Sequence, residues 1–141
     1  MKHQLEILLD TDDLVAINKP AGLLSIPDRE QSEPSLKDIL LQKYGTIYTV
    51  HRLDKETSGV IVFAKNEIIH KFLCKQVDEK ETKKTYNGLV LGQLYETEGI
   101  IDEPIGEHPV KKGLMTIVRK GKPSITAYRL LESFPSYSWM E

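Results

Sequence analysis

Two side chains of opposite charge, Arg52 and Asp54, stand two residues apart near the middle of the chain. In an extended backbone, residues i and i+2 leave the same face, so the guanidinium and the carboxylate are expected to lie close together. A carboxylate near a guanidinium stays ionised and oriented, which suits a nucleophile or a base. Spacing alone favours a simpler interpretation, in which Asp54 is an Asx-turn acid that caps Glu56-Thr57. The residues by themselves leave both alternatives open.

The segments around Asp54 predict the elements that must position it. Runs of branched residues at 47–50 and 59–64 predict one strand on each side, and an apolar run at 14–18 predicts a third. Residues 19–27 (KPAGLLSIP) contain two prolines and a glycine and therefore predict an ordered loop.

Two helices are predicted in the first half of the chain. Ser35 is placed to cap the first helix, with Asp38 three residues later in a capping box and Gly45 as its stop. Asn66 is placed to cap the second, whose side chains repeat at helical spacing: Ile68, Ile69, Phe72, Leu73, Gln76 and Val77.

The second half predicts strands without helices. Residues 85–91 predict a strand, residues 96–107 a polar connector, and residues 114–118 and 124–131 a hairpin of two strands. Strands and helices do not alternate strictly, which favours an α+β fold: a mixed, largely antiparallel central sheet with flanking helices. The last residues, 136–141, predict a strand that begins but does not finish, with an unpaired edge.

Length and composition exclude several classes of protein. The chain has 141 residues, which is the size of one domain, and 40% of them are hydrophobic. Its apolar runs are much shorter than a membrane span, and its acidic N-terminal segment does not resemble a signal peptide. The single Cys74 excludes an internal disulfide framework and a cysteine-built zinc site. These features predict a cytoplasmic protein.

The charge is small in total but uneven along the chain. The net charge is −2, yet residues 111–122 carry five basic side chains and no acidic one. Such a run is most simply a solvated hairpin. The alternative is a local basic surface that contacts RNA phosphates.

Four collinear segments resemble one enzyme family. Residues 51–65 (HRLDKETSGVIVFAK) are similar to the HRLDxxTSGLLLFAK signature of the RluA-type pseudouridine synthases, which isomerise uridine in ribosomal and transfer RNA. Residues 13–22 (DLVAINKPAG) resemble the family's DLLVVNKPAG segment, and residues 84–90 (KTYNGLV) resemble its KxYxAxV motif, with Gly88 at the usual alanine. Residues 121–128 resemble a later segment, so the resemblance covers the chain from about Asp13 to its end.

The resemblance implies roles for individual residues. Asp54 falls on the family's essential aspartate, Tyr86 on its active-site tyrosine, and Arg52 on the arginine that enters the RNA stack in place of the flipped base. His51 and Thr57 are expected to fix the loop. The alternative for Tyr86 is a half-buried strand tyrosine with a bonded hydroxyl.

The implied reaction detaches uracil from the ribose, turns it and rejoins it through C5, after the nucleotide has been flipped out of the stack. It needs no metal and no organic cofactor. One alternative is a non-catalytic RNA-binding remnant of the same fold. Another is an enzyme that cleaves free nucleosides, which would need a second positioned acid that the sequence does not offer.

Relatives continue past the last residue here, with a GRTHQIR-type segment whose arginine pairs with the catalytic aspartate. We therefore expect residues 1–141 to be the N-terminal part of a single catalytic domain, without a separate N-terminal RNA-binding domain. The 141-residue piece is expected to be inactive or nearly so by itself. The oligomeric state and the particular uridine are not predicted.

Overall fold

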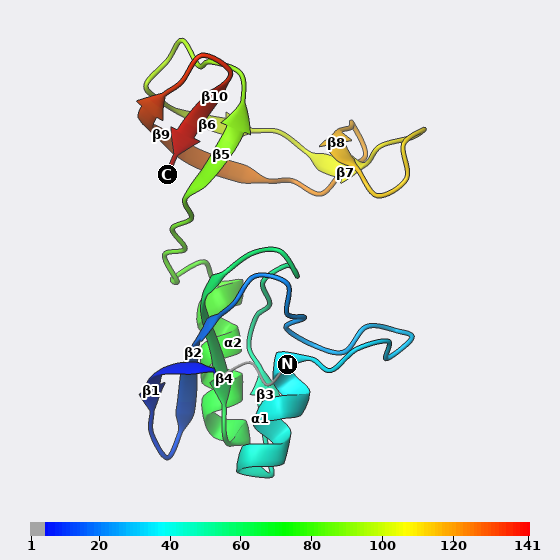
Figure 1. Ribbon diagram of the computed structural model, residues 1–141, viewed down its shortest axis with the longest axis vertical. Helices are drawn as coiled ribbons and strands as arrows, with labels where there is room; N and C mark the ends of the chain where they lie inside the picture. Colours follow the sequence, from blue (N-terminus) through cyan, green and yellow to red (C-terminus); the bar gives the residue numbers. More distant parts are fainter. Residues whose placement is uncertain (1–4) are drawn as a thin grey trace. The chain divides into compact units, whose positions relative to one another are not determined.

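The computed structural model describes residues 5–141 of the chain (Figure 1). Residues 1–4, which begin the segment for which we expect no signal peptide, lie outside the described residues. The chain divides into two compact units, Met1–Lys83 and Lys84–Glu141. Both helices belong to the first unit, and all pairs of named strands are antiparallel, so the α+β prediction is confirmed.

The first unit is a four-stranded sheet with two helices. Its strands lie in the order β1-β2-β4-β3, and α2 packs against β4 and β3 (Figure 1). In chain order the elements are β1 (Glu6–Asp10), β2 (Leu14–Lys19), α1 (Leu36–Tyr44), β3 (Tyr48–Thr49), β4 (Gly59–Ala64) and α2 (Glu67–Asp78). β1 is an addition to the prediction, which has no strand before residue 14.

The hydrophobic core of the first unit lies between the sheet and α1. Alternate residues of β2 and β4 are fully buried, and they pack in one cluster with Leu36 and Leu40 of α1. Each such side chain contributes about 1.5–3 kcal/mol when it leaves water. The sheet residues of this cluster are Val15, Ile17, Ile61 and Phe63.

Both helices begin as the sequence predicts. The Ser35 hydroxyl accepts a hydrogen bond from the Asp38 amide, and the Asp38 carboxylate accepts one from the Ser35 amide, which completes the capping box. Gly45 ends α1 with φ +77°, a left-handed conformation that glycine adopts without strain. Asn66 caps α2 by accepting from the Ile69 amide at 2.9 Å.

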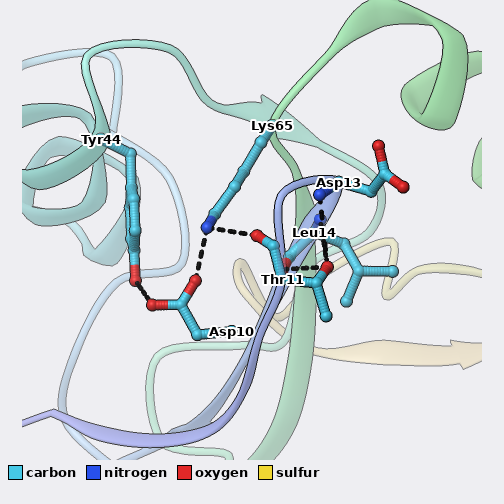
Figure 2. Close-up of polar contacts among 6 residues, drawn as sticks. All are labelled: Asp10, Thr11, Asp13, Leu14, Tyr44 and Lys65. Atoms are coloured by element: carbon cyan, nitrogen blue, oxygen red, sulfur yellow. Dashed lines mark hydrogen bonds and ion pairs between the residues drawn. The ribbon is translucent and has the colours of Figure 1, made fainter.

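Lys65, at the end of β4, joins three elements of this unit (Figure 2). Its ammonium donates to the Asp10 carboxylate and to the Thr11 carbonyl, the latter at 2.5 Å. The Tyr44 hydroxyl, at the end of α1, donates to the other Asp10 oxygen at 2.6 Å. The Lys65 ammonium also lies 4.2 Å from the centre of the Tyr44 ring. The β1–β2 hairpin is thus fixed to both α1 and β4.

The second unit consists of strands alone. Four of them form a sheet in the order β5-β10-β9-β6, and β7 pairs with β8 in a separate two-stranded ribbon. In chain order they are β5 (Gly88–Leu91), β6 (Glu98–Asp102), β7 (Ile105–Glu107), β8 (Met115–Ile117), β9 (Ile125–Ser133) and β10 (Tyr137–Met140). The buried apolar residues of the described chain all lie in the first unit.

The predicted hairpin of 114–118 with 124–131 is wrong. β8 pairs with β7, whereas β9 pairs with β6 and β10. The two strands predicted to form the hairpin therefore do not pair with each other. For the same reason, residues 96–107 are not a simple connector, because they contain β6 and β7. Gly121 allows this arrangement, since a Cβ there would lie 2.6 Å from the Ile105 carbonyl carbon.

The unpaired edge predicted for the last strand is also wrong. β10 lies inside the sheet and pairs with β5 on one side and β9 on the other. The backbone of Glu141 continues the ladder by exchanging two hydrogen bonds of 2.9 Å with Arg129. The sequence near β10 does not reveal that it pairs with β5, because β5 lies more than 40 residues earlier in the chain.

Candidate active site

Asp54 lies on an exposed turn between β3 and β4. The turn is closed by the backbone, since the Thr57 amide donates to the Asp54 carbonyl at 3.1 Å. The Asp54 carboxylate is exposed, and within residues 5–141 it accepts no hydrogen bond and forms no ion pair. The Asx-turn interpretation is therefore wrong: this carboxylate does not hold its own turn.

Arg52 and Asp54 flank a buried residue. Both side chains are exposed, whereas Leu53 between them is 8% exposed and belongs to the core cluster. The alternation is that of a locally extended chain, with the two charged side chains directed away from the core. Among the described residues, no ion pair joins Arg52 to Asp54, so the guanidinium and the carboxylate are both available to a ligand.

The loop that carries Asp54, residues 51–58, is hydrogen-bonded to the loop of residues 19–27. Ser25 is buried; its hydroxyl donates to the Leu53 carbonyl at 2.6 Å and accepts from the Leu53 amide at 3.1 Å. The Gly22 amide donates to the Lys55 carbonyl at 2.8 Å. Ser25 is not among the site residues predicted from the sequence. A hydroxyl between apolar neighbours was the only local signal, and its partner lies 28 residues away.

Lys19 is a fully buried lysine beneath this pair of loops. It continues the alternation of Val15 and Ile17 along β2, so its side chain enters the protein interior. Its ammonium donates to three carbonyls, those of Pro20 (3.0 Å), Leu23 (2.8 Å) and Lys55 (3.0 Å). Burial lowers the pKa of Lys19, and the nearby carboxylates of Glu56 and Asp54 partly oppose that shift.

Two further contacts hold the 51–58 loop. The His51 ring accepts a hydrogen bond at Nε2 from the Val62 amide at 3.2 Å, which ties the start of the loop to β4. The exposed Lys55 ammonium lies 2.6 Å from the Glu33 carboxylate. Hydrogen bonding to Glu33 raises the pKa of Lys55. The cation next to Asp54 in sequence is therefore paired with another acid.

Tyr86 belongs to the second unit and lies just before β5, not within a strand. Its side chain is 53% exposed, and its hydroxyl has no hydrogen-bond partner among the described residues. The half-buried strand tyrosine with a bonded hydroxyl is therefore the wrong alternative. Tyr86 lines a mainly apolar cleft of about 800 Å³ within the second unit, together with Lys84, Tyr128 and Arg129.

The basic segment 111–122 lies on and beside the β7–β8 ribbon. Its five basic side chains are all exposed: Lys111, Lys112, Arg119, Lys120 and Lys122. At the tip of the ribbon, the His108 ring accepts hydrogen bonds at Nδ1 from the amides of Val110 and Lys111, each 3.1 Å long. The positive charges of residues 111–122 are therefore exposed on and beside a hydrogen-bonded ribbon.

The described residues contain neither a membrane-spanning helix nor a metal-binding cluster. No helix in the range 5–141 combines the length and the apolar character that crossing a bilayer requires. In the same range, no three His, Cys, Asp or Glu side chains converge in the manner of metal ligands.

Comparison with known proteins identifies the family. The RNA pseudouridylate synthase family matches residues 13–141, and the match begins where the resemblance in sequence begins. The chain is 40% identical over 136 residues to ribosomal large subunit pseudouridine synthase D of Nitrosomonas europaea, covering 92% of this chain and 39% of that protein. It is 37% identical over 137 residues to the dual-specificity RNA pseudouridine synthase RluA of Pasteurella multocida, covering 94% and 61%.

Solved structures agree with this assignment. Human RNA pseudouridylate synthase domain containing 4 matches with a TM-score of 0.74 and 26% identity, over 96% of this chain and 57% of that one. Human RNA pseudouridylate synthase domain containing 1 shares the fold, with a TM-score of 0.77. The chain spans about two-fifths to three-fifths of the length of these relatives. By the extent of the family match, the chain belongs to the RNA pseudouridylate synthase family.

Proposed function

We propose that this chain carries catalytic residues of an enzyme that isomerises uridine to pseudouridine in ribosomal or transfer RNA. The observation that carries the proposal is the Asp54 carboxylate, which is exposed and unpaired among the described residues although its loop is held by buried side chains. An exposed carboxylate without a protein partner, on a loop that the protein interior holds in place, is available to a ligand. The names of the relatives, all RNA pseudouridine synthases, support the same activity.

Arg52 is the proposed RNA-binding residue. A uridine within a stacked RNA hides its glycosidic bond, so the nucleotide must be flipped out at a cost of about a few kcal/mol. An exposed, planar guanidinium two residues from the acid can stack and donate hydrogen bonds in the vacated space. Arg52 is free to do so because it forms no ion pair with any described residue.

Asp54 and Tyr86 are the proposed catalytic residues. The N1–C1′ bond breaks, uracil leaves as a delocalised anion, and a C5–C1′ bond forms in its place. The ionised Asp54 acts on the sugar side. Tyr86 stacks under the base and, directly or through a water molecule, takes the proton that C5 loses, while N1 takes up a proton in exchange, so that the reaction is an isomerisation. This role of Tyr86 is supported by its exposed ring and by its hydroxyl, which has no hydrogen-bond partner among the described residues.

The proposal extends to domain organisation and location. The family match covers residues 13–141 and so includes residues of both units, which supports the proposal that the chain is the N-terminal part of a single catalytic domain. We also propose that the protein works in the cytoplasm, because its single cysteine requires no oxidising compartment.

Tritium release from RNA that contains 5-tritiated uridine tests the function, because C5 loses its hydrogen only when it bonds to C1′. In the full-length gene product, we expect Asp54→Asn to lower release at least about a hundredfold, the contribution of one positioned acid or base. The matched control is Asp12→Asn, which makes the same change at an exposed acid in the β1–β2 turn. It should release tritium as the wild type does.

Three other results would contradict the proposal. RNA binding without release in the wild type would indicate a non-catalytic RNA-binding protein. Uracil freed from nucleosides would indicate a glycoside-cleaving enzyme. Equal release by the wild type and Asp54→Asn would remove Asp54 from the reaction.

A further inference from the structure

The orientation of Asp54 must come from its backbone, because its carboxylate has no hydrogen bond or ion pair with the residues described. A catalytic carboxylate misplaced by about 1 Å can lose a hundredfold in rate. The residues that fix the peptide groups on each side of Asp54 are therefore candidates for positioning it. This reasoning rests on the proposed function.

The residue before Asp54 is fixed by a single side chain. The Ser25 hydroxyl is bonded to both backbone groups of Leu53, to the carbonyl at 2.6 Å and the amide at 3.1 Å. Ser25 is 3% exposed, so water cannot readily replace it. The Leu53 carbonyl belongs to the peptide group that joins Leu53 to Asp54, and Ser25 therefore sets the plane from which Asp54 extends.

The residue after Asp54 is fixed from the same side. The Lys55 carbonyl accepts hydrogen bonds from the buried Lys19 ammonium at 3.0 Å and from the Gly22 amide at 2.8 Å. The 19–27 loop is itself joined to α1, because the amides of Leu36 and Lys37 donate to its carbonyls at 2.7 and 3.2 Å. The backbone on each side of Asp54, at Leu53 and Lys55, is thus held by hydrogen bonds to the 19–27 loop.

We propose that Ser25 is a positioning residue for Asp54, with Lys19 as its counterpart at the residue that follows Asp54. Without the Ser25 hydroxyl, both backbone groups of Leu53 lose their partner, and the Leu53–Asp54 peptide can rotate. The carboxylate then spends less time in the reactive orientation, although RNA contacts made elsewhere are unchanged. If Ser25 has this role, its loss lowers kcat per folded molecule and leaves KM nearly unchanged.

The test is Ser25→Ala in the full-length gene product, with tritium release measured over a range of RNA concentrations. We expect kcat to fall about tenfold to a hundredfold while KM stays within about twofold. Ser138→Ala is the matched control: it also removes a buried hydroxyl, one that donates to the Gly92 carbonyl in the second unit. It should keep the wild-type kcat.

Hydrogen exchange of the Leu53 amide adds a readout that does not depend on activity. Exchange at Leu53 should accelerate in Ser25→Ala, whereas the amides within β2 and β4 should keep their protection. If Ser25→Ala does not fold, Ser25→Cys replaces it, because cysteine keeps nearly the same volume and weakens both hydrogen bonds.

The possible results distinguish a failure of the positioning role from a failure of the proposed function. Normal kcat in Ser25→Ala, beside an inactive Asp54→Asn, overturns the positioning role and leaves the function intact. A raised KM with normal kcat also overturns it, since Ser25 would then serve RNA binding. A wild type without tritium release overturns the proposed function and this inference with it.

Discussion

A buried ammonium beneath the candidate site shows how one residue can link the fold to the chemistry. Lys19 occupies a core-facing position of β2, where an apolar residue would be the ordinary choice. Its charge is tolerated because its three N–H groups match three carbonyls that the turns around it leave without strand partners. Two of those carbonyls belong to the 19–27 loop and one to Lys55, so Lys19 holds the two loops together.

We predict that Lys19→Met destabilises the first unit. Methionine fills similar space, but it leaves the Pro20 and Leu23 carbonyls without their donor and the Lys55 carbonyl with the Gly22 amide alone. This should lower the free energy of unfolding by at least about 2 kcal/mol. Urea unfolding followed by circular dichroism at 222 nm measures this unit, because both helices lie in it. The control is Lys71→Met, at an exposed position of α2. Equal midpoints for the two variants would contradict the prediction.

At the scale of elements, the Asp10 carboxylate joins the β1–β2 hairpin to the rest of the first unit (Figure 2). Hydrogen bonds from Lys65 and then Tyr44 hold its pKa below the ordinary value of 3.8. The folded state therefore binds this proton less readily than the unfolded state. The contribution of Asp10 to stability is present above its unfolded pKa and is lost as the pH falls through its folded pKa.

Comparison of the wild type with Asp10→Asn at two pH values tests this link. At pH 7 the variant should unfold at a lower urea concentration than the wild type, because asparagine carries no charge for Lys65. As the pH falls through the folded-state pKa of Asp10, the two midpoints should converge, since Asp10 is then protonated in both states. Asp12→Asn, at an exposed acid of the same turn, should show no such convergence. A difference that stays constant with pH would count against the ion pair.

At the scale of the whole molecule, a net charge of −2 coexists with a basic β7–β8 ribbon. Binding to RNA by counterion release depends on the local phosphate contacts, not on the total charge. The ribbon is the part of the described structure where several exposed cations occur without an intervening acid. We expect it to contact RNA phosphates.

Charge reversal measures that contribution. The triple variant Lys111→Glu, Lys112→Glu and Lys120→Glu of the full-length gene product should bind RNA more weakly. The slope of log K against log salt should fall by up to about 2, at roughly 0.7 for each phosphate contact to single-stranded RNA. Reversal of Lys43, Lys71 and Lys80, which are exposed in the first unit, is the matched control. Equal slopes for the two triple variants would exclude the ribbon as a phosphate contact.

The sequence by itself determined the features that depend on residues close together in the chain. Both helix caps, the Gly45 stop, two core strands and the family were predicted correctly. Capping is a local property, because a side chain and an amide three residues apart meet whatever the rest of the chain does.

Only the tertiary structure decided which distant segments pair. In the structure, β10 lies between β5 and β9, and β8 pairs with β7. The Ser25 hydroxyl is hydrogen-bonded to Leu53, which lies 28 residues later in the chain. It also showed that the turn at Asp54 is closed by its backbone and that the carboxylate has no hydrogen bond or ion pair with residues 5–141. The physical reason is that a backbone amide or carbonyl can form the same hydrogen bond with many different partners. Only the packing of the whole unit selects one of them.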